Sequence, residues 1–213
     1  VFCLIKLFAG TELLLYFGVF MAVWGACMAL IENDFRRLFA YHIISQVGYM
    51  IASLAIGGEI GIDGASAHAF NHILYKGTLL MCAGTVIAAT GKRKISQLSG
   101  LAKKLPVTAG CFLIASMAIA GFPLLNGFVS KSLIMNAAAE SGFYWAELLL
   151  MVASVGTLMS VTLKVNYFVF WGKSSEDIEA CEKDVPLSRK AAMILGALAC
   201  RSEEHTSELQ SQG

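Results

Sequence analysis

The chain has 213 residues, of which 57% are hydrophobic and 15% are charged, and its formal net charge is +1. A soluble domain usually has about 45–50% apolar and about 25% charged residues, so this composition indicates an integral membrane protein. The charge is close to neutral and no basic stripe alternates with aromatic residues, so the sequence gives no indication of nucleic-acid binding.

The apolar runs predict an all-α fold, a polytopic bundle of transmembrane helices. A helix needs about 20 mainly apolar residues to cross a bilayer, and several runs reach or approach this length. Five complete spans and a truncated sixth are expected: 13–31, 35–56, 65–90, 107–140, 143–171 and 191–200.

The fourth of these spans contains a break. Gly121, Pro123 and Gly127 interrupt its apolar run. Proline inside a helix removes a hydrogen bond and kinks or breaks the run, and the freed backbone groups need protein or water around them. The sequence therefore predicts one broken helix.

Both ends of the chain look cut. Val1 is not a start methionine and opens inside an apolar run. The segment Arg201–Ser211, RSEEHTSELQS, interrupts the last apolar run without turn chemistry and resembles the translation of a sequencing-library adapter. We therefore expect residues 1–200 to be a fragment of one transmembrane domain, followed by a non-native, disordered tail at 201–213.

The connections between spans alternate in charge. Those after the first, third and fifth spans are basic, and those between them carry acidic residues and no Lys or Arg. The positive-inside rule then predicts a multi-pass protein of the cell inner (plasma) membrane with cytoplasmic basic loops. The basic residues are Arg36, Arg37, Lys92, Arg93, Lys94, Lys103, Lys104, Lys173, Lys183, Arg189 and Lys190, and the acidic ones are Glu59, Asp63, Glu140 and Glu147.

Three titratable residues recur every four positions in the third span. A helix stacks His68, His72 and Lys76 on one face. Neutral histidine accepts a hydrogen bond on one ring nitrogen and donates one from the other, and burial favours the neutral amine of lysine over its ammonium ion, so this row can relay protons. The alternative is a polar patch that holds helices together.

Other polar residues in the spans are further candidates, and we expect Lys131 to be a second proton-relay residue. Lys131 follows the helix break, where transporters place ion sites, although a lysine can also extend to the membrane interface. Lys164 and His42 are possible secondary relay groups, and Asn126 can bridge the path between Lys76 and Lys131.

The sequence contains no pattern of a catalytic, cofactor or metal site. It has no Gly-rich phosphate loop, nucleophile elbow, paired zinc ligands or haem spacing. His68 and His72 have the spacing of a metal-binding helix pair, but Lys76 on the same face would repel a cation. We expect no cofactor and no metal, and a transporter subunit rather than an enzyme.

Three motifs in order resemble one known family. They are DFRRLFAYHIISQVGYM (34–50), HAFNHILYKGTLLMCAGTVI (68–87) and GFPLLNGFVSK (121–131). The third motif contains the helix break and the charged residue Lys131. They are similar to signatures of the proton-conducting antiporter-like subunits of respiratory complex I and of Mrp-type sodium/proton antiporters. The phrases AYHIISQVGYM, HILYKG and NGFVSKS are most similar to the D-type subunit of the Mrp antiporters.

The resemblance implies roles, partners and alternatives. Lys76 would be the central relay lysine, His68 and His72 its neighbours, and Lys131 the terminal charged residue. The function would be proton or cation translocation, with H⁺ and possible Na⁺, among other subunits of a multisubunit complex in a lipid bilayer. The alternatives are a proton-pumping membrane subunit of NADH-quinone oxidoreductase, which is an enzyme only as part of that complex, and a non-transporting membrane scaffold. The family's other half-channel would precede Val1.

Overall fold

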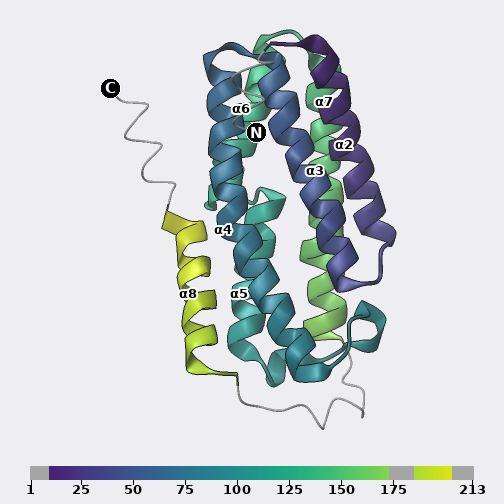
Figure 1. Cartoon of the computed structure of the whole chain (residues 1–213), viewed down its shortest axis with the longest axis vertical. Coiled ribbons are helices and arrows are strands. Elements are labelled where there is room, and N and C mark those ends of the chain that lie inside the picture. Colours follow the sequence, from purple (N-terminus) through teal and green to yellow (C-terminus); the bar gives the residue numbers. More distant parts are fainter. Residues whose placement is uncertain (1–9, 173–184, 203–213) are drawn as a thin grey trace.

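The computed structural model describes residues 10–172 and 185–202, and within these ranges the chain is helical, without a strand. The main helices, in chain order, are α2 (Glu12–Ile31), α3 (Phe35–Ile56), α4 (Gly58–Thr90), α5 (Pro106–Ala120), α6 (Asn126–Glu140), α7 (Tyr144–Thr157) and α8 (Leu187–Ser202). Helix α7 continues directly into η3 (Leu158–Trp171), a π-helical stretch, and the short 3-10 turns η1 (Ile95–Gln97) and η2 (Leu101–Lys103) lie between α4 and α5. The predicted all-α bundle with one broken helix is confirmed (Figure 1).

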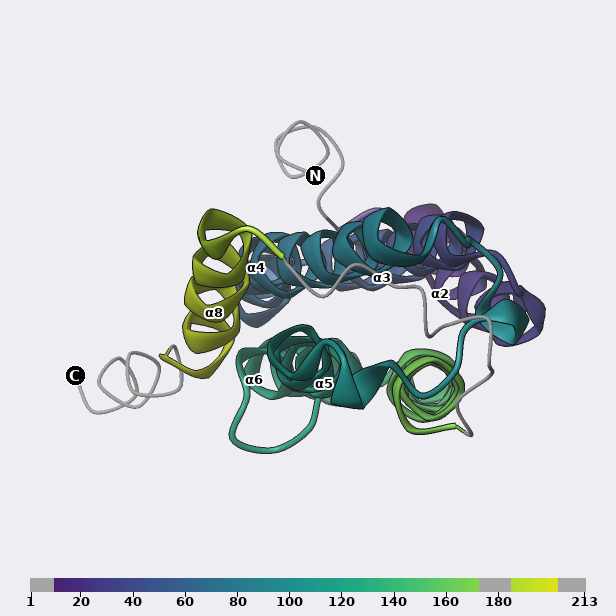
Figure 2. The same cartoon turned by 90° about the horizontal axis from the view of Figure 1, so that it is seen from below.

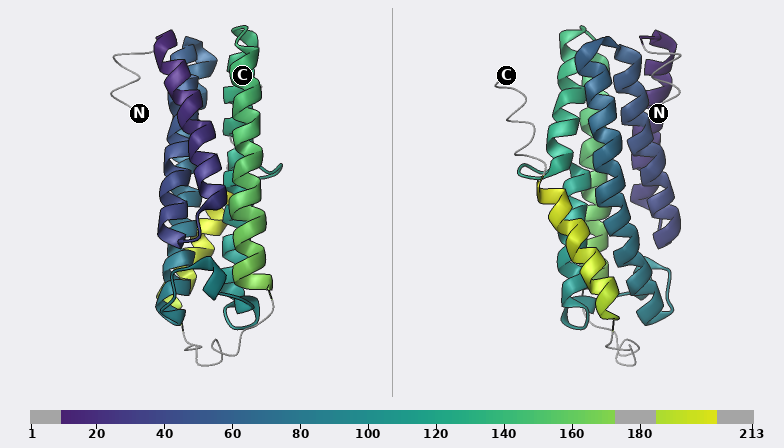
Figure 3. Two further views of the ribbon diagram at one scale, coloured as in Figure 1. Left: turned by 90° about the vertical axis from the view of Figure 1, so that its right-hand side faces the viewer. Right: turned by 60° about the vertical axis from the view of Figure 1, so that its left-hand side comes forward.

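The helices form two layers. Helices α4, α3 and α2 lie side by side in one layer, while α5, α6 and the continuous α7–η3 helix form the other (Figure 2). Helix α8 packs against α4 and α5 at the edge and is inclined to the other helices (Figure 3). Residues that face the other layer are therefore shielded from lipid.

Length and hydropathy make these helices suitable for crossing a membrane. Among the described residues, α2, α3, α4 and α7 with η3 are long and apolar enough to span a bilayer, and α5 is a shorter apolar helix. Many large apolar side chains on α2 and on α7–η3 are exposed, including Phe20 and Leu148. This is the pattern of helices whose outer faces contact lipid or other membrane subunits.

Helix α4 begins earlier than the expected start at residue 65. Its 33 residues, at 1.5 Å each, make it about 50 Å long, more than the hydrocarbon thickness of a bilayer. Glu59 and Asp63 are exposed on its first two turns, where the sequence pattern indicated a loop. Gly57 and Gly58 have positive φ angles of 73° and 68°, which allow the chain to reverse tightly before this helix.

The broken helix consists of α5 and α6, which follow each other along the same layer (Figure 1). Helix α5 ends at Gly121, whose φ of 81° is left-handed, and Leu124 also has a positive φ, 72°. Gly127 lies in the first turn of α6, and a Cβ there would collide with the carbonyl oxygen of Ala118. Gly121 thus ends the first half-helix, whereas Gly127 lets the second approach it closely.

The last helix is longer than the span expected at 191–200, since α8 covers Leu187–Ser202. Arg201 and Ser202 therefore continue a helix, and the rest of the expected tail, 203–213, lies outside the described residues. That the tail is non-native, and that residues 203–213 are disordered, stay predictions.

Glycines allow α2 and α3 to pack with their backbones in contact. A Cβ at Gly18 would lie 2.5 Å from the backbone nitrogen of Ala52, and one at Gly48 would lie 2.5 Å from that of Ala22. Ser45 adds a hydrogen bond from its hydroxyl to the carbonyl oxygen of Ala22, at 2.9 Å. Small residues commonly permit this close approach in membrane bundles.

We expect Gly48→Ala to weaken the bundle, because its methyl group would meet helix backbone that cannot move independently. Overpacking of this kind costs about 1–3 kcal/mol. Gly84→Ala is the matched control: nothing lies within 4 Å of a Cβ there, and alanine is the better helix former. Thermal unfolding of the detergent-purified complete protein measures both changes, and equal midpoints for the two variants would contradict the packing argument.

Candidate functional site

Lys76 lies on α4 and is buried, with its side chain directed toward the neighbouring helix α3. Its side chain is 4% exposed, and its Nζ donates a hydrogen bond to the carbonyl oxygen of Phe39 on α3, at 2.8 Å. The same Nζ lies 4.8 Å from the centroid of the Phe39 ring, a distance that allows a cation–π contact. Lys76 is therefore directed away from lipid and held by neutral groups.

Lys131 lies on α6 and reaches back to the end of α5. Its Nζ donates to the carbonyl oxygen of Ile119 at 2.8 Å and to that of Ala120 at 3.4 Å. It also donates to the hydroxyl of Ser154 on α7 at 3.0 Å, and it lies 5.1 Å from the ring centroid of Tyr49. A cation is favourable here because carbonyl groups at a helix C-terminus carry partial negative charge. The helix break thus creates the binding site of this ammonium group.

His68 connects three helices. Its Nδ1 lies 2.9 Å from the hydroxyl oxygen of Ser130 on α6, and its Nε2 lies 3.0 Å from Oε1 of Gln46 on α3. The hydroxyl of Tyr75, two turns further along α4, is 3.5 Å from both Gln46 Oε1 and His68 Nε2. Since Ser130 precedes Lys131, this buried chain leads toward the second lysine.

His72 and the asparagines occupy the space beside this chain. His72 is only partly buried, its ring packs edge-on against Tyr75 at 5.6 Å between centroids, and its Nε2 is buried without a protein partner. The amide nitrogen of Asn71 donates to the backbone carbonyl of Asn126 at 2.9 Å, so the two asparagines connect α4 to the start of α6. Both side-chain polar atoms of Asn126 are buried without a protein partner, which makes this position suited to water.

His42 faces a different helix from its neighbour Gln46. Its Nε2 lies 2.9 Å from the hydroxyl of Ser160 on η3, and its Nδ1 is buried without a protein partner. A second polar cluster follows on η3, where the amide of Asn166 donates to the hydroxyl of Ser116 on α5, at 2.9 Å. His42 is thus buried, but it belongs to the interface with η3 and not to the His68 chain.

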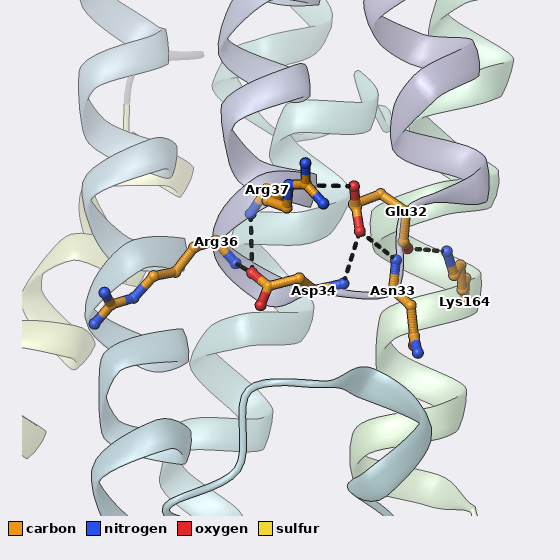
Figure 4. A network of polar contacts seen from close by, with 6 residues as sticks. All are labelled: Glu32, Asn33, Asp34, Arg36, Arg37 and Lys164. Carbon is orange, nitrogen blue, oxygen red and sulfur yellow. Dashed lines mark hydrogen bonds and ion pairs between the residues drawn. The ribbon is translucent and has the colours of Figure 1, made fainter.

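Lys164 is held at the end of α2 (Figure 4). Its Nζ donates to the backbone carbonyl oxygens of Leu30, at 2.8 Å, and of Glu32, at 2.5 Å. These are free or terminal carbonyls of the helix, so Lys164 caps α2 and joins it to η3.

The connection after α2 carries its own polar network (Figure 4). Asp34 caps α3 by accepting hydrogen bonds from the backbone nitrogens of Arg36 and Arg37, at 2.8 and 3.2 Å. The carboxylate of Glu32 accepts from the N–H groups of Asp34 and Asn33 and lies 3.9 Å from the Arg37 guanidinium. The hydrogen bond from Asp34 is the main reason that the pKa of Glu32 is below its ordinary value, so Glu32 is charged at neutral pH.

The structure brings some predicted residues together and adds others. His68 bonds to Ser130, the residue that precedes Lys131 on α6, whereas Lys76, His42 and Lys164 each have separate partners. Sequence reasoning assigned no role to Tyr75, Ser130 or Ser154. Tyr75 was detectable, since it lies seven residues after His68 and therefore on the same helical face. Among the described residues no group of three His, Cys, Asp or Glu side chains is placed to hold a metal ion.

We expect Lys164→Met to lower the stability of the bundle, because the last carbonyl groups of α2 lose their charged donor. The loss should be about 1 kcal/mol, as for a cation at a helix C-terminus. Lys103→Met is the control, since Lys103 is exposed. Denaturation midpoints of the purified complete protein would show the difference, and a midpoint for Lys164→Met equal to that of Lys103→Met would rule out the capping role.

Comparison with known proteins identifies the family. The family model described as NADH:quinone oxidoreductase/Mrp antiporter, TM, matches residues 3–160. The D-type subunit of the Na(+)/H(+) antiporter from Alkalihalophilus pseudofirmus is 35% identical over 172 residues, 81% of this chain and 34% of that protein. NADH-quinone oxidoreductase subunit N of Desulforudis audaxviator is 37% identical over 135 residues, 63% of this chain and 27% of that protein. The chain therefore spans about a third of the length of these relatives.

The fold agrees with this assignment. The structure of the Mrp complex from Dietzia sp. DQ12-45-1b contains a chain that superposes with a TM-score of 0.81, over 92% of this chain and 45% of that one, at 24% sequence identity. At this identity the likeness establishes the fold alone. With the family match over residues 3–160, it shows that the chain belongs to the NADH:quinone oxidoreductase/Mrp antiporter family of transmembrane proteins.

Proposed function

We propose that this chain relays protons as part of a D-type subunit of a Na⁺/H⁺ antiporter, within a multisubunit membrane complex. The observation that carries the proposal is the pair of buried lysines, Lys76 and Lys131, which face the inside of the bundle. Among the described residues neither forms an ion pair with a carboxylate, and main-chain carbonyl oxygens accept their hydrogen bonds. An unpaired ammonium ion inside a membrane is costly, so such groups are kept where a proton is exchanged.

The path between the lysines would pass through His68. Ser130 connects the His68 ring to the helix that carries Lys131. On the other side, Tyr75 and His72 lie on α4 between His68 and Lys76, and the buried Nε2 of His72 needs a partner such as water. His72 and Asn126 would then contribute through bound water, and His42 and Lys164 lie outside this path.

A second candidate is a proton-pumping membrane subunit of NADH-quinone oxidoreductase, which the similarity to subunit N favours. The two candidates differ in what drives the proton. An Mrp-type complex exchanges protons for a cation without NADH, whereas the oxidoreductase couples them to electron transfer. Proton flux in vesicles that contain the purified complex, driven either by a sodium gradient or by NADH with quinone, separates them.

We expect Lys76→Ala to reduce proton flux at least about ten-fold, because the central proton-exchanging group is lost. Lys131→Met should reduce flux to a similar degree, since methionine fills the same space without a titratable group. The measurement is proton flux in vesicles that contain the complete protein in its complex, with subunit assembly checked in parallel. Lys103→Ala, an exposed lysine, is the control.

Wild-type flux in an assembled Lys76→Ala variant would mean that the polar residues only hold helices together. The chain would then be a membrane scaffold, the third candidate, and the relay proposal would be withdrawn.

Charge indicates how the chain is oriented. The connection after α2 and the one after α4 lie together, since the N–H of Phe35 bonds to the carbonyl of Arg93 and that of Ile95 to the carbonyl of Asn33. Both are basic, whereas the opposite end carries Glu59, Asp63, Glu140 and Glu147. We infer that the basic end faces the cytoplasm and that the membrane is the cell inner membrane.

This orientation predicts the outcome of cysteine labelling in intact cells. A membrane-impermeant maleimide should modify Ser141→Cys, in the exposed connection between α6 and α7, and leave Gln97→Cys at the basic end unmodified until the cells are opened. The variants are made in the complete protein, and unsubstituted protein corrects for reaction at native cysteines. Labelling of Gln97→Cys alone in intact cells would reverse the orientation.

A further inference from the structure

The buried side chain of Gln46 has an unusual position for a residue in the middle of a membrane helix. It is fully buried on α3, and its Oε1 lies 3.0 Å from Nε2 of His68. The hydroxyl of Tyr75 approaches the same oxygen at 3.5 Å. A buried amide in an apolar bundle is costly unless it is hydrogen-bonded, so these two contacts determine the direction in which the amide points.

The contact restricts the protonation of His68. An amide oxygen accepts hydrogen bonds and cannot donate them, so the histidine nitrogen that faces it must carry the hydrogen. Neutral imidazole has only one N–H, and therefore Nδ1 of His68 is the unprotonated nitrogen. That nitrogen lies 2.9 Å from the hydroxyl of Ser130, which can donate to it in place of its longer contact with the carbonyl oxygen of Gly127, at 3.3 Å.

This tautomer determines which side of the His68 ring can accept a proton and which side can release one. Its basic nitrogen, Nδ1, faces α6 and the end of the bundle interior where Lys131 lies, and its N–H faces α3 and Tyr75. A proton that arrives from the Lys131 side would bind Nδ1, and the hydrogen on Nε2 could then pass to the hydroxyl oxygen of Tyr75, 3.5 Å away, as Tyr75 gives up its own hydrogen. With the opposite tautomer, Nε2 would be the basic nitrogen and the transfer from Ser130 would have no acceptor.

We propose that Gln46 is a positioning residue for proton transfer through His68, whose Nε2–H tautomer it selects. This inference rests on the proposed relay function. Gln46 itself does not pass the proton, because an amide oxygen is much less basic than imidazole and does not take up the proton that the ring holds. Tyr75 supports it by donating its hydroxyl hydrogen to the same oxygen.

Other groups around His68 cannot replace this effect. The Tyr49 ring of α3 lies 5.8 Å from the His68 ring, between centroids, and its hydroxyl donates to the carbonyl of Leu150 instead. From α6, Lys131 is a donor that is occupied by other acceptors, and on α4 His72 contacts Tyr75. Among the described residues Gln46 is therefore the nearer acceptor on the Nε2 side of His68, at 3.0 Å, whereas the Tyr75 hydroxyl lies at 3.5 Å.

The test compares two substitutions made in the complete protein. Each variant is assembled in its complex and placed in vesicles, and proton flux is measured as a function of pH. Gln46→Leu removes the acceptor and should lower flux about ten-fold, the effect expected from the loss of one buried hydrogen bond. Gln46→Glu keeps an acceptor of the same length and should retain flux within about three-fold. Its carboxylate stabilises the doubly protonated ring, so the flux optimum should move to higher pH.

Controls separate this role from a merely structural one. Ser53→Ala removes a buried hydrogen bond, to the carbonyl of Gly61, from the same helix and should leave flux and pH profile unchanged. An assembled Gln46→Leu variant with wild-type flux would overturn the proposal. An unshifted pH profile for Gln46→Glu would also overturn it, and this second result is decisive if the Gln46→Leu variant does not assemble. Lys76→Ala in the same assay tests the relay itself: if it loses flux while the Gln46 variants do not, only the positioning role fails.

Discussion

An ammonium group inside a membrane bundle needs hydrogen-bond acceptors, and this chain supplies them mainly from its backbone. A carboxylate partner would hold the proton strongly and add a second buried charge, whereas a carbonyl oxygen stabilises the ammonium ion and leaves the neutral amine accessible. The two lysines differ in this respect. Lys131 has two carbonyl oxygens, the Ser154 hydroxyl and an aromatic ring around it, while Lys76 has one carbonyl oxygen and the ring of Phe39. Loss of a proton therefore disrupts more contacts at Lys131.

The helix break follows from the same requirement. In a continuous helix the carbonyl groups of Ile119 and Ala120 would be bonded to the next turn, so the chain must end α5 there to make them available. Gly121 allows this with a left-handed turn, and a Cβ at this residue would lie 3.0 Å from Cδ of Lys131. The close approach of Gly127 to Ala118 then brings α6 near enough for Lys131 to reach back. The break, the glycines and the lysine are thus parts of one arrangement.

The sequence was sufficient for the features that depend on local pattern. Hydropathy and turn residues predict the bundle and its broken helix, and the four-residue spacing identifies His68 and Lys76 as interior residues of α4. It could not show that His72 is partly exposed, because helix rotation depends on packing against α6 and α8. The early start of α4 was missed because exposed Glu59 and Asp63 resemble a loop when the helix extends beyond the bilayer. The partners of Lys164 and His68 come from other helices, 132 and 62 residues away along the chain, and spacing within one helix contains no information about them.

Several buried polar atoms near His68 and the two lysines have no hydrogen-bond partner among the described residues. A polar group that is shielded from solvent needs a partner, and where protein provides none, water is the usual one. Gln46 Nε2, Asn71 Oδ1, His72 Nε2 and the Asn126 amide have no protein partner, and they lie on α3, α4 and α6, around His68. His42 Nδ1 and Asn166 Oδ1, at the interface with η3, also have none. Lys164 and Asp34, by contrast, have partners that close helix ends. The retention of the unpaired atoms around His68, a histidine bonded on both sides, is consistent with the proposed relay through bound water.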